Sequence, residues 1–431
     1  DRLLSRGLGD VYKRQVYSRT WYDDTCVSPS WQSPLLIQNK NFDFCIIGGG
    51  LAGLSCAYHL AEMGASVALC EHSMIGAGAS GRNGGFCSAG WAAGSDQISK
   101  LVGPVISKEL ESIGADGLKW MRERAFSAKY AKVQPTSGVI SLGLRGYGPE
   151  ISSRLDEIEL QEFVVGPRYK WGIIDNEAFH FHPLNFLKIF LQEVVGQGVE
   201  VFENTGAVQV NGSEVFFSNG NRISADRMIW ATGGYSIGKN SILKKFLLPI
   251  QTFICVTSPM PTILERHIPT KMALGDDRRA GNYFRRLPDD RLLWGMGVSA
   301  LSQHSVDSIK RMGWKNIKAH FPAMMEEMRC DNIKFDYAWS GLMAYASHFM
   351  PYVGKVSDRE SILSGFGGHG MNTAPIAGKR MASFLSGDPN ILDPFLEIPR
   401  RNIFGLIGRL GAEFEYRRLS AIDYIAETYG I

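Results

Sequence analysis

Three glycines and one glutamate near the start of the sequence have the spacing needed to bind a diphosphate-linked nucleotide. Gly48, Gly50 and Gly53 form the pattern G-x-G-x-x-G, and Glu71 follows 18 residues after Gly53. In this pattern the first glycine allows a tight turn, the second lets backbone N–H groups approach a pyrophosphate, and the third lets a helix pack closely on a strand. Glu71 is placed to accept a hydrogen bond from a ribose hydroxyl.

The segments around these residues supply the elements that must position them. Residues 42–47, "FDFCII", have the apolar pattern of a buried parallel strand, and residues 66–71, "SVALCE", resemble a second one. Apolar residues between them recur at helical spacing, and Gly64 is expected to end that helix. The order strand, loop, helix, strand predicts dinucleotide binding, but NAD and FAD share this loop.

A second glycine-rich run favours FAD. Residues 76–86, "GAGASGRNGGF", begin five residues after Glu71, where a nicotinamide-binding domain would usually enter its next helix. A flexible surface linker is the alternative, but a linker has little use for Arg and Asn among its glycines. We therefore expect this run to line a flavin nucleotide with exposed backbone N–H groups and polar side chains. The predicted contacts are Ser80, Gly81, Arg82, Asn83 and Gly84.

Two later segments indicate the same ligand. Residues 227–234, "RMIWATGG", are an apolar strand that ends at Ala231, Thr232 and Gly233, after a strand meander whose backbone near Val208 would contact adenine. Residues 362–388, "ILSGFGGHGMNTAPIAGKRMASFLSGD", read as strand, glycine loop and helix. We expect this helix over about 374–386, with Pro375 in its first turn and Asn372 or Thr373 as its cap. Its positive N-terminus would stabilise reduced flavin, with predicted contacts at Gly368, Gly370, Met371 and Asn372.

In this order the motifs resemble the D-amino-acid oxidase-like superfamily of FAD-dependent oxidoreductases, and within it the gamma-glutamylputrescine oxidoreductase group. The likeness covers roughly residues 16–390, with supporting stretches at 16–24, 176–190, 275–297 and 339–356. It implies an α/β fold with a Rossmann-like FAD-binding domain assembled from discontinuous segments, and a second α+β substrate domain with a mainly antiparallel sheet. The expected division is an N-terminal arm (16–40), an FAD-binding domain (41–100, 170–240 and 335–388), a substrate domain (101–169 and 241–334) and a C-terminal helical tail (389–431).

The resemblance also implies a reaction. Enzymes of this superfamily take a hydride from the carbon next to an amine, pass it to flavin N5, and release an imine that hydrolyses. The expected partners are a small amine or amino-acid substrate and an electron acceptor, which is oxygen or another molecule. A flavoprotein subunit that passes electrons to a partner protein, and a non-catalytic FAD-binding protein, are the alternatives.

Such a reaction needs positioning groups more than an acid–base pair. The candidates are His369, Tyr283, Arg285 and Tyr345. In the predicted strand 282–286, Tyr283 and Arg285 share one face and could present a hydroxyl and a guanidinium to a substrate carboxylate, although a solvated sheet arginine is the alternative. His369 lies in the last glycine loop and could be catalytic. The alternative is a histidine whose ring nitrogens form hydrogen bonds with the nearby backbone. Trp339, Tyr345 and His348 would wall the pocket, unless they form ordinary aromatic core.

Two departures from the superfamily bear on the cofactor. Its sarcosine oxidases attach flavin through a cysteine just before the final glycine loop, whereas the corresponding residues 341–346, "GLMAYA", contain none. Those enzymes also have a lysine where Asn372 stands. We therefore expect FAD to be bound non-covalently.

Composition excludes several other classes. The 431 residues carry a net charge of +3 and are 45% hydrophobic, which gives no support for nucleic-acid binding. No apolar run approaches the roughly 20 residues of a membrane span, and seven cysteines without paired spacing suggest reduced thiols in the cytoplasm. His180-x-His182 lacks a third ligand nearby, so no metal is expected. Residues 9–15, "GDVYKRQ", resemble the translation of a sequencing-library transposon end, so residues 1–15 are treated as non-native.

Overall fold

The structure, a computed structural model, describes residues 19–429 except 28–30, 35, 37–39, 146–147, 152, 236–240 and 279–280. Residues 1–15, which we expect to be non-native, lie outside the described residues. Among the described helices, none has the length and apolar character needed to cross a membrane.

The first β-sheet has a parallel core around β1 (Lys40–Ile47). β1 pairs in parallel with β2 (Val67–Cys70) and with β10 (Arg222–Trp230), and it is buried along most of its length, as expected for a strand covered on both faces. Across the described residues the strand order is β16–β17–β10–β1–β2–β7, and a β8–β9 meander extends from β10. The other strands are β7 (Glu200–Phe202), β8 (Ala207–Asn211), β9 (Glu214–Phe217), β16 (Tyr352–Lys355) and β17 (Glu360–Ser364).

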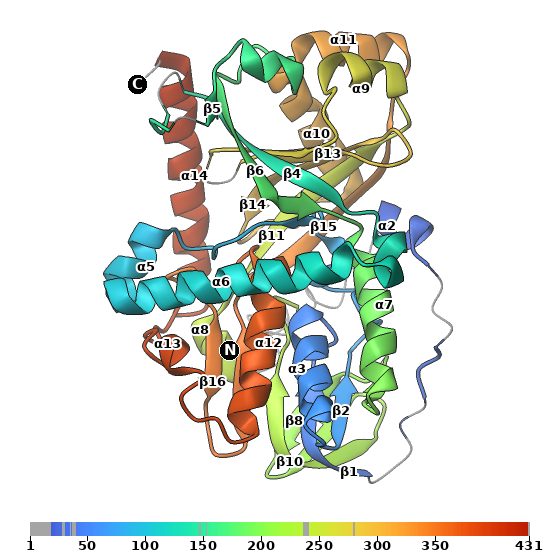
Figure 1. The fold of residues 1–431 in the computed structure, drawn as a ribbon, viewed down its shortest axis with the longest axis vertical. Helices are drawn as coiled ribbons and strands as arrows, with labels where there is room; N and C mark the ends of the chain where they lie inside the picture. The colour runs from blue at the N-terminus through green and yellow to red at the C-terminus, as the bar shows by residue number, and fades with distance from the viewer. Residues whose placement is uncertain are drawn as a thin grey trace, which may run out of the picture.

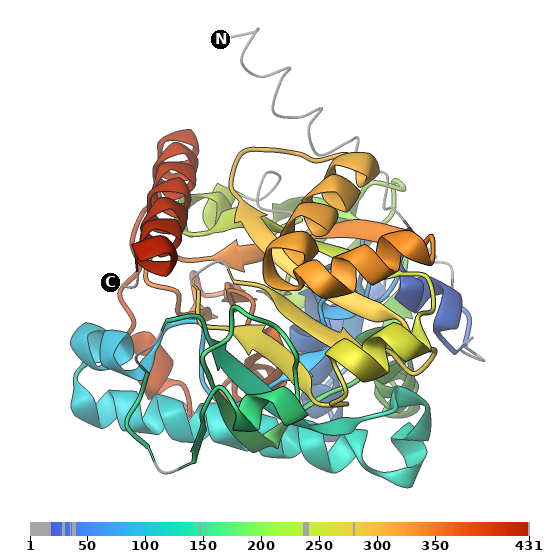
Figure 2. The same ribbon diagram turned by 90° about the horizontal axis from the view of Figure 1, so that it is seen from above.

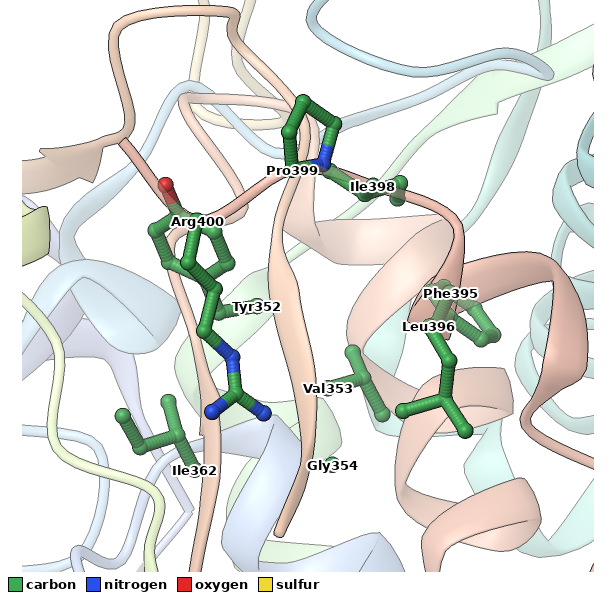
Figure 3. Close-up of a pocket in the computed structure, with 9 residues that line it drawn as sticks. All are labelled: Tyr352, Val353, Gly354, Ile362, Phe395, Leu396, Ile398, Pro399 and Arg400. Carbon is green, nitrogen blue, oxygen red and sulfur yellow. The ribbon is translucent and has the colours of Figure 1, made fainter. Parts of the chain in front are cut away.

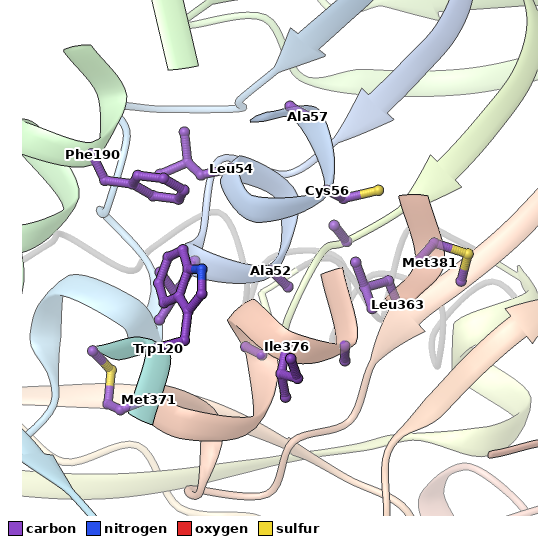
Figure 4. Packing of buried hydrophobic residues seen from close by; sticks show 14 of the residues in the cluster. Ala52, Leu54, Cys56, Ala57, Trp120, Phe190, Leu363, Met371, Ile376 and Met381 are labelled. Atoms are coloured by element: carbon purple, nitrogen blue, oxygen red, sulfur yellow. The ribbon is translucent and has the colours of Figure 1, made fainter. Parts of the chain in front are cut away.

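Helices α3 (Leu51–Glu62), α6 (Pro104–Ala125), α7 (Pro183–Gly196) and α12 (Gly370–Leu385) share one hydrophobic core with this sheet (Figure 1). Figure 4 shows Leu54, Trp120 and Phe190 of three of these helices within that core. Burying a side chain of this size stabilises the fold by about 1.5–3 kcal/mol. α3 and α12 approach so closely that a Cβ on Gly378 would lie 2.8 Å from the Ala52 carbonyl oxygen. This packing fixes the N-termini of both helices relative to the sheet.

The second sheet is mainly antiparallel, with the order β15–β11–β14–β13–β12–β4–β6–β3 across the described residues and β5 paired to β6. Its strands are β3 (Phe86–Cys87), β4 (Thr136–Gly143), β5 (Arg154–Leu155), β6 (Trp171–His180), β11 (Leu248–Thr257), β12 (Ala273–Asp276), β13 (Tyr283–Arg286), β14 (Leu292–Ser299) and β15 (Phe335–Tyr345). Helices α9 (Pro261–His267), α10 (Val306–His320) and α11 (Pro322–Cys330) cover its outer face, at the top of Figure 1. The expected combination of a Rossmann-like domain with a mainly antiparallel second domain is confirmed.

The remaining helices are short, apart from α14. They are α2 (Trp21–Thr25), α4 (Ala79–Arg82), α5 (Ser95–Val102), α8 (Ser241–Phe246), α13 (Asp393–Leu396), α14 (Leu406–Tyr429) and the 3₁₀ turns η1 (Ala128–Val133) and η2 (Glu159–Glu162). α14 forms a long rod beside the second sheet (Figure 2).

Sheet membership differs from the expected domain boundaries. β6 and β15 fall within the ranges expected for the FAD-binding domain but lie in the antiparallel sheet. α6 falls within the range expected for the substrate domain but packs on α12. The chain crosses from one sheet to the other within residues 170–240 and again within residues 335–388. Motifs mark the loops that bind ligand, but they do not tell which sheet a neighbouring strand joins.

Candidate functional site

A cavity of about 1350 Å³ lies where the two sheets meet. Pockets for drug-sized ligands are usually about 300–1,000 Å³, so this one can hold a larger molecule. Its wall comes from glycine loops of the first sheet, from strands of the second sheet and from the start of α14. Of the residues proposed from the sequence, those that line it are Gly48, Gly50, Glu71, Ser80, Arg82, Asn83, Gly84, Val208, Ala231, Thr232, Gly233, Tyr283, Tyr345, Gly368, His369, Gly370, Met371 and Asn372. Gly53, Gly81 and Arg285 are not part of this wall.

The first glycine loop has the backbone that its motif requires. Gly48 has φ +117°, a conformation that favours glycine, and a Cβ there would lie 2.7 Å from the Ala231 carbonyl oxygen. Gly50, the N-cap of α3, has no side chain to cap the helix, and Ser80 Oγ accepts only the first N–H of the helix, that of Leu51. The helix therefore presents backbone N–H groups and its positive dipole end to the cavity. Gly53 faces away, and a Cβ there would lie 2.0 Å from the Gly48 carbonyl oxygen, so its role is close packing.

Glu71 directly follows β2, next to this loop. Its two carboxylate oxygens accept hydrogen bonds from the backbone N–H groups of Gly49 (2.8 Å) and Ser73 (2.9 Å). Burial raises the pKa of Glu71, although these two N–H groups act in the opposite direction. Each oxygen keeps a second lone pair, so the carboxylate can still accept a hydrogen bond from a ligand hydroxyl.

The second glycine run lines the cavity, and part of it is helical. Residues 79–82 form the single helical turn α4, and Ser80 Oγ accepts a hydrogen bond from the Leu51 N–H at 3.1 Å. Gly81 lies behind this turn, because a Cβ there would lie 2.2 Å from the Gly76 carbonyl oxygen. The run thus supports the first loop as well as lining the cavity.

The polar side chains of that run are largely used within the protein. The Asn83 amide donates to the carbonyl oxygens of Ala79 and Ser80, and its oxygen accepts from the Gly85 N–H. Arg82 is buried, and its carbonyl oxygen accepts a hydrogen bond from Trp339 Nε1. These contacts hold the loop in shape and leave mainly backbone for a ligand.

The strand that returns to the first loop ends at the cavity as expected. Ala231 donates its N–H to the Ile47 carbonyl oxygen, which places residues 231–233 next to the first glycine loop. Thr232 Oγ1 is buried and has no hydrogen-bond partner among the described residues. Val208 lies at the cavity edge on β8 with half of its surface exposed.

The last glycine loop leads into α12 four residues earlier than expected. The helix begins at Gly370 with His369 as its N-cap, so the expected caps Asn372 and Thr373 lie inside the first turn, and Pro375 follows them. The Asn372 side chain instead donates to the Gly90 and Gly114 carbonyl oxygens, which ties α12 to α6. The start of α12 has no side-chain cap hydrogen bond among the described residues, so a second positive helix end faces the cavity.

Three of the four predicted catalytic side chains line the cavity: Tyr283, Tyr345 and His369. Burial raises the pKa of both tyrosines, so their hydroxyls are neutral donors near pH 7. His369 is exposed to the cavity, and the surrounding protein lowers its pKa by desolvation, which keeps the imidazole neutral.

Arg285 is the fourth, and the expectation that it faces substrate is wrong. Its side chain is 3% exposed and donates to the carbonyl oxygens of Gly84 (2.7 Å) and Phe181 (3.0 Å), to Tyr22 Oη (3.2 Å) and to His180 Nδ1 (3.0 Å). Tyr283 and Arg285 both face the loop after α4, as the alternation of the strand predicts, but this loop covers Arg285 and leaves Tyr283 at the cavity. Arg285 therefore joins this loop, β6 and α2.

Trp339 and His348 also differ from their expected place in the pocket wall. Trp339 is fully buried in the core that holds α2, and His348 contacts Tyr352 Oη and the Pro399 carbonyl oxygen. Neither lines the cavity.

The two histidines of His180-x-His182 serve structural roles. His180 Nε2 lies 2.8 Å from the Lys271 carbonyl oxygen, and His182 Nδ1 accepts the Asn185 N–H to cap α7. Burial and the nearby Arg285 charge lower the pKa of each to about 3. The described residues contain no cluster of three or more His, Cys, Asp or Glu side chains that could hold a metal ion.

Sequence reasoning missed several cavity residues. Thr252 and Met343 line the cavity from β11 and β15, and Arg409 lines it from α14. A polar residue within the apolar run "PIQTFICV" was the available signal for Thr252. Arg409 had none, because it lies in a tail that carries no family motif.

A second, smaller pocket of about 230 Å³ lies outside the large cavity, near β16 and α13 (Figure 3). Its wall is largely apolar, and Arg400 at its rim donates to the Lys355 carbonyl oxygen. None of the predicted site residues lines it.

Comparison with known proteins agrees with this geometry. Residues 43–384 match the family model described as FAD dependent oxidoreductase. The chain belongs to this family. It is 29% identical over 91% of its length to a probable oxidoreductase of Haemophilus influenzae, covering 93% of that protein. It is also 29% identical over 83% of its length to the gamma-glutamylputrescine oxidoreductase of Escherichia coli, covering 86% of it.

Solved structures of this flavoenzyme fold are similar as well. A glycine oxidase from Geobacillus kaustophilus superposes with a TM-score of 0.65 at 16% identity, over 84% of this chain and 99% of that one. An L-proline dehydrogenase from P. horikoshii superposes with a TM-score of 0.62 at 17% identity, over 83% of this chain and 98% of that one. At these identities the likeness concerns the fold.

As a member of the FAD-dependent oxidoreductase family, the chain uses FAD, and the cavity suits this cofactor. The N-termini of α3 and α12 face the cavity, and neither N-cap residue supplies a side-chain hydrogen bond to its helix, which favours bound anionic groups. The unpartnered Thr232 hydroxyl offers a donor and an acceptor at the wall. A side chain at Gly50 would project toward Ser80 into the same space.

Proposed function

We propose that this flavoenzyme oxidises the C–N bond of an amine or amino acid to an imine, which then hydrolyses. FAD, when bound, supplies the hydride acceptor for this reaction. The observation that supports the proposal is the shared cavity: glycine loops of the parallel sheet form one side, and the hydroxyls of Tyr283 and Tyr345 come from the antiparallel sheet on the other. We further propose that the predicted glycine, Glu71 and Thr232 contacts hold FAD without a covalent bond.

The side chains at the antiparallel sheet would orient the substrate. The Tyr283 ring lies against Gly295, because a Cβ on Gly295 would lie 2.0 Å from atoms of that ring. The Tyr283 hydroxyl interacts with Thr252. Tyr345 Oη lies near Gly368 in the last glycine loop. Two neutral hydroxyls held in this way can donate hydrogen bonds to a polar substrate group without adding charge to the cavity.

His369 would manage the substrate proton. An amine must lose its ammonium proton before a hydride can leave the neighbouring carbon. The lowered pKa of His369 leaves its imidazole neutral, so one ring nitrogen can accept that proton. Replacing it with alanine should slow oxidation most near neutral pH and less at high pH, where the free amine carries no proton.

The substrate class is suggested by the relatives. The E. coli protein is a gamma-glutamylputrescine oxidoreductase, and the relative from Bacillus licheniformis is a glycine oxidase. The E. coli relative is 29% identical and the glycine oxidase 22%, so we propose an extended amine that carries an acyl or amino-acid group.

The test is anaerobic mixing of the holoenzyme with gamma-glutamylputrescine, putrescine, glycine and L-proline. Loss of the oxidised flavin absorbance with one of these amines is the expected result, and the rate of reoxidation in air then separates an oxidase from a dehydrogenase. A holoenzyme whose flavin no amine reduces, although dithionite reduces it, would contradict the proposal and favour a non-catalytic FAD-binding protein.

A further inference from the structure

Few charged side chains face the cavity at its antiparallel-sheet side. Among the described lining residues, the full cations are Arg82, Lys244 and Arg409. Arg82 is buried within the loop after α4, and its Nε donates to the Ser340 carbonyl oxygen. Lys244 is an exposed side chain on the short helix α8. Arg409 is the partly buried cation on the long helix α14.

Arg409 is held in one orientation. Its Nε donates to the Ala300 carbonyl oxygen at 2.8 Å, and within the described residues its two terminal nitrogens have no hydrogen-bond partner. The guanidinium fork is thereby fixed at one side and open at the other, which is the arrangement that binds a carboxylate through two parallel hydrogen bonds.

Arg409 borders an apolar cluster, because the Ala300 carbonyl group that it contacts belongs to that cluster. Leu248, Ile250, Ala300 and Ile403 form this cluster, and Met343, Tyr345 and Tyr416 pack against it. Tyr345 is therefore shared between this cluster and the last glycine loop. An ion pair in such partly apolar surroundings is screened less than one at an open surface.

The helix that carries Arg409 is anchored at two further points. Glu413, one turn later, accepts hydrogen bonds from Ser299 Oγ (3.0 Å) and from the Ala300 N–H (2.9 Å). Asp423, farther along, forms a 3.2 Å ion pair with Arg145. Glu413 fixes α14 against the end of β14, and Asp423 fixes it against the segment after β4, so Arg409 is a built part of the cavity wall.

We propose that Arg409 binds an anionic group of the substrate, a carboxylate, and so selects amines that carry one. This rests on the proposed function, because it assigns a substrate class to the same cavity. α14 then has a role in substrate recognition, although it lies outside residues 43–384 that match the family model.

The test measures binding separately from turnover. Butanoate and its neutral isostere butanamide are titrated into holoenzyme by calorimetry, for wild type, Arg409→Gln and Arg409→Lys. Butanoate should bind wild type more tightly than butanamide, and Arg409→Gln should weaken butanoate about tenfold or more, as expected for a lost charge-assisted hydrogen bond. Arg409→Lys should weaken it less, and butanamide should respond to neither change.

The matched controls are Arg418→Gln and Lys244→Gln. Arg418 lies on the opposite, exposed face of α14 in an ion pair with Glu415, so its loss removes the same charge without touching the cavity. Thermal unfolding of each variant checks that α14 stays docked. In turnover, Arg409→Gln should raise KM for gamma-glutamylputrescine with little change in kcat, and leave KM for putrescine unchanged.

Three results would overturn the inference. They are the absence of butanoate binding to wild type, an equal loss of butanoate affinity in Arg418→Gln, and a loss of butanoate affinity in Lys244→Gln but not in Arg409→Gln. Failure of the proposed function gives a different pattern, in which butanoate binding depends on Arg409 but no amine reduces the flavin.

Discussion

At the scale of single residues, the position of a charge in the packed structure decides its role. Arg285 and Arg409 have the same side chain, but Arg285 makes four hydrogen bonds inside the protein and Arg409 makes one. A buried guanidinium needs such a complete set of acceptors, because an unpaired charge is costly to remove from water. The first arginine therefore supports the fold, and the second is available to a ligand.

Replacing Arg285 with lysine should destabilise the protein without a specific effect on substrate. Lysine cannot reach Gly84, Phe181, Tyr22 and His180 together, and each buried acceptor left unpaired costs about 1–3 kcal/mol. We expect a loss of roughly 2–5 kcal/mol in the free energy of unfolding, measured with denaturant. Unchanged stability together with a raised KM would instead return Arg285 to the substrate site.

Gly50→Val should give a folded protein that does not bind FAD. Gly50 has φ −82°, which valine adopts without strain, and its Cβ would contact only Ser80 side-chain atoms, at 3.1 Å and beyond. The added methyl groups would occupy the cavity beside the α3 N-terminus. Gly94 is a matched control, since it is also an N-cap glycine with negative φ and has nothing within 4 Å of its Cβ position.

Flavin absorbance after purification and far-UV circular dichroism test this pair. Gly94→Val should keep its flavin and change stability by less than about 1 kcal/mol. A Gly50→Val protein that retains a full complement of FAD would show that this loop does not carry the pyrophosphate.

At the scale of elements, the ends of helices decide which groups meet the ligand. α12 begins at Gly370, where His369 ends the glycine loop, although the sequence offers better caps at Asn372 and Thr373. Tertiary contacts override local preference here, because the Asn372 side chain is drawn to carbonyl oxygens of α6 and its neighbouring loop. The uncapped N–H groups are consequently left for the cavity.

α14 is held by Glu413, and this anchor should depend on pH. Burial acts to raise the Glu413 pKa, but hydrogen bonds from Ala300, Ser299 and Arg417 outweigh it and lower the pKa below its usual 4.5. A carboxyl with a depressed folded-state pKa contributes stability above its unfolded pKa and loses it as pH falls through the folded pKa. Glu413→Gln should therefore cost about 1–3 kcal/mol at pH 7 and progressively less below pH 4.5.

Thermal unfolding of wild type and Glu413→Gln over this pH range measures the difference directly. Glu415→Gln, on the exposed side of the same helix, should change the stability little at pH 7 or in acid. A gap between wild type and Glu413→Gln that does not narrow in acid would mean that the carboxylate charge does not anchor α14.

At the scale of the whole molecule, local constraints were predictable from the sequence and long-range ones were not. The glycines of the first loop act through their own backbone and nearest strand, so the motif predicted their geometry. The partners of Arg285 come from as far as 263 residues away in the chain, which no spacing rule reveals. The same holds for β6 and β15, whose sheet is chosen by pairing with distant strands.

The shared cavity between the two sheets leads to a prediction about the intact protein: FAD should hold the sheets together without a covalent bond. The stretch 341–346, which lines the cavity from β15, contains no cysteine. Cys70 does line the cavity, but it is 1% exposed and burial raises its thiol pKa, which disfavours the reactive thiolate. Acid or heat precipitation should thus release all flavin to the supernatant.

Because FAD binds only the folded chain, adding it to apoprotein at about 100 times its Kd should stabilise the fold by about 2.7 kcal/mol and raise Tm. Both sheets should then unfold in one transition. Tryptophan fluorescence and flavin release, measured together, should change at the same temperature. Flavin that stays with the precipitate would contradict non-covalent binding, and an apoprotein whose Tm ignores FAD would contradict a cofactor that bridges the two sheets.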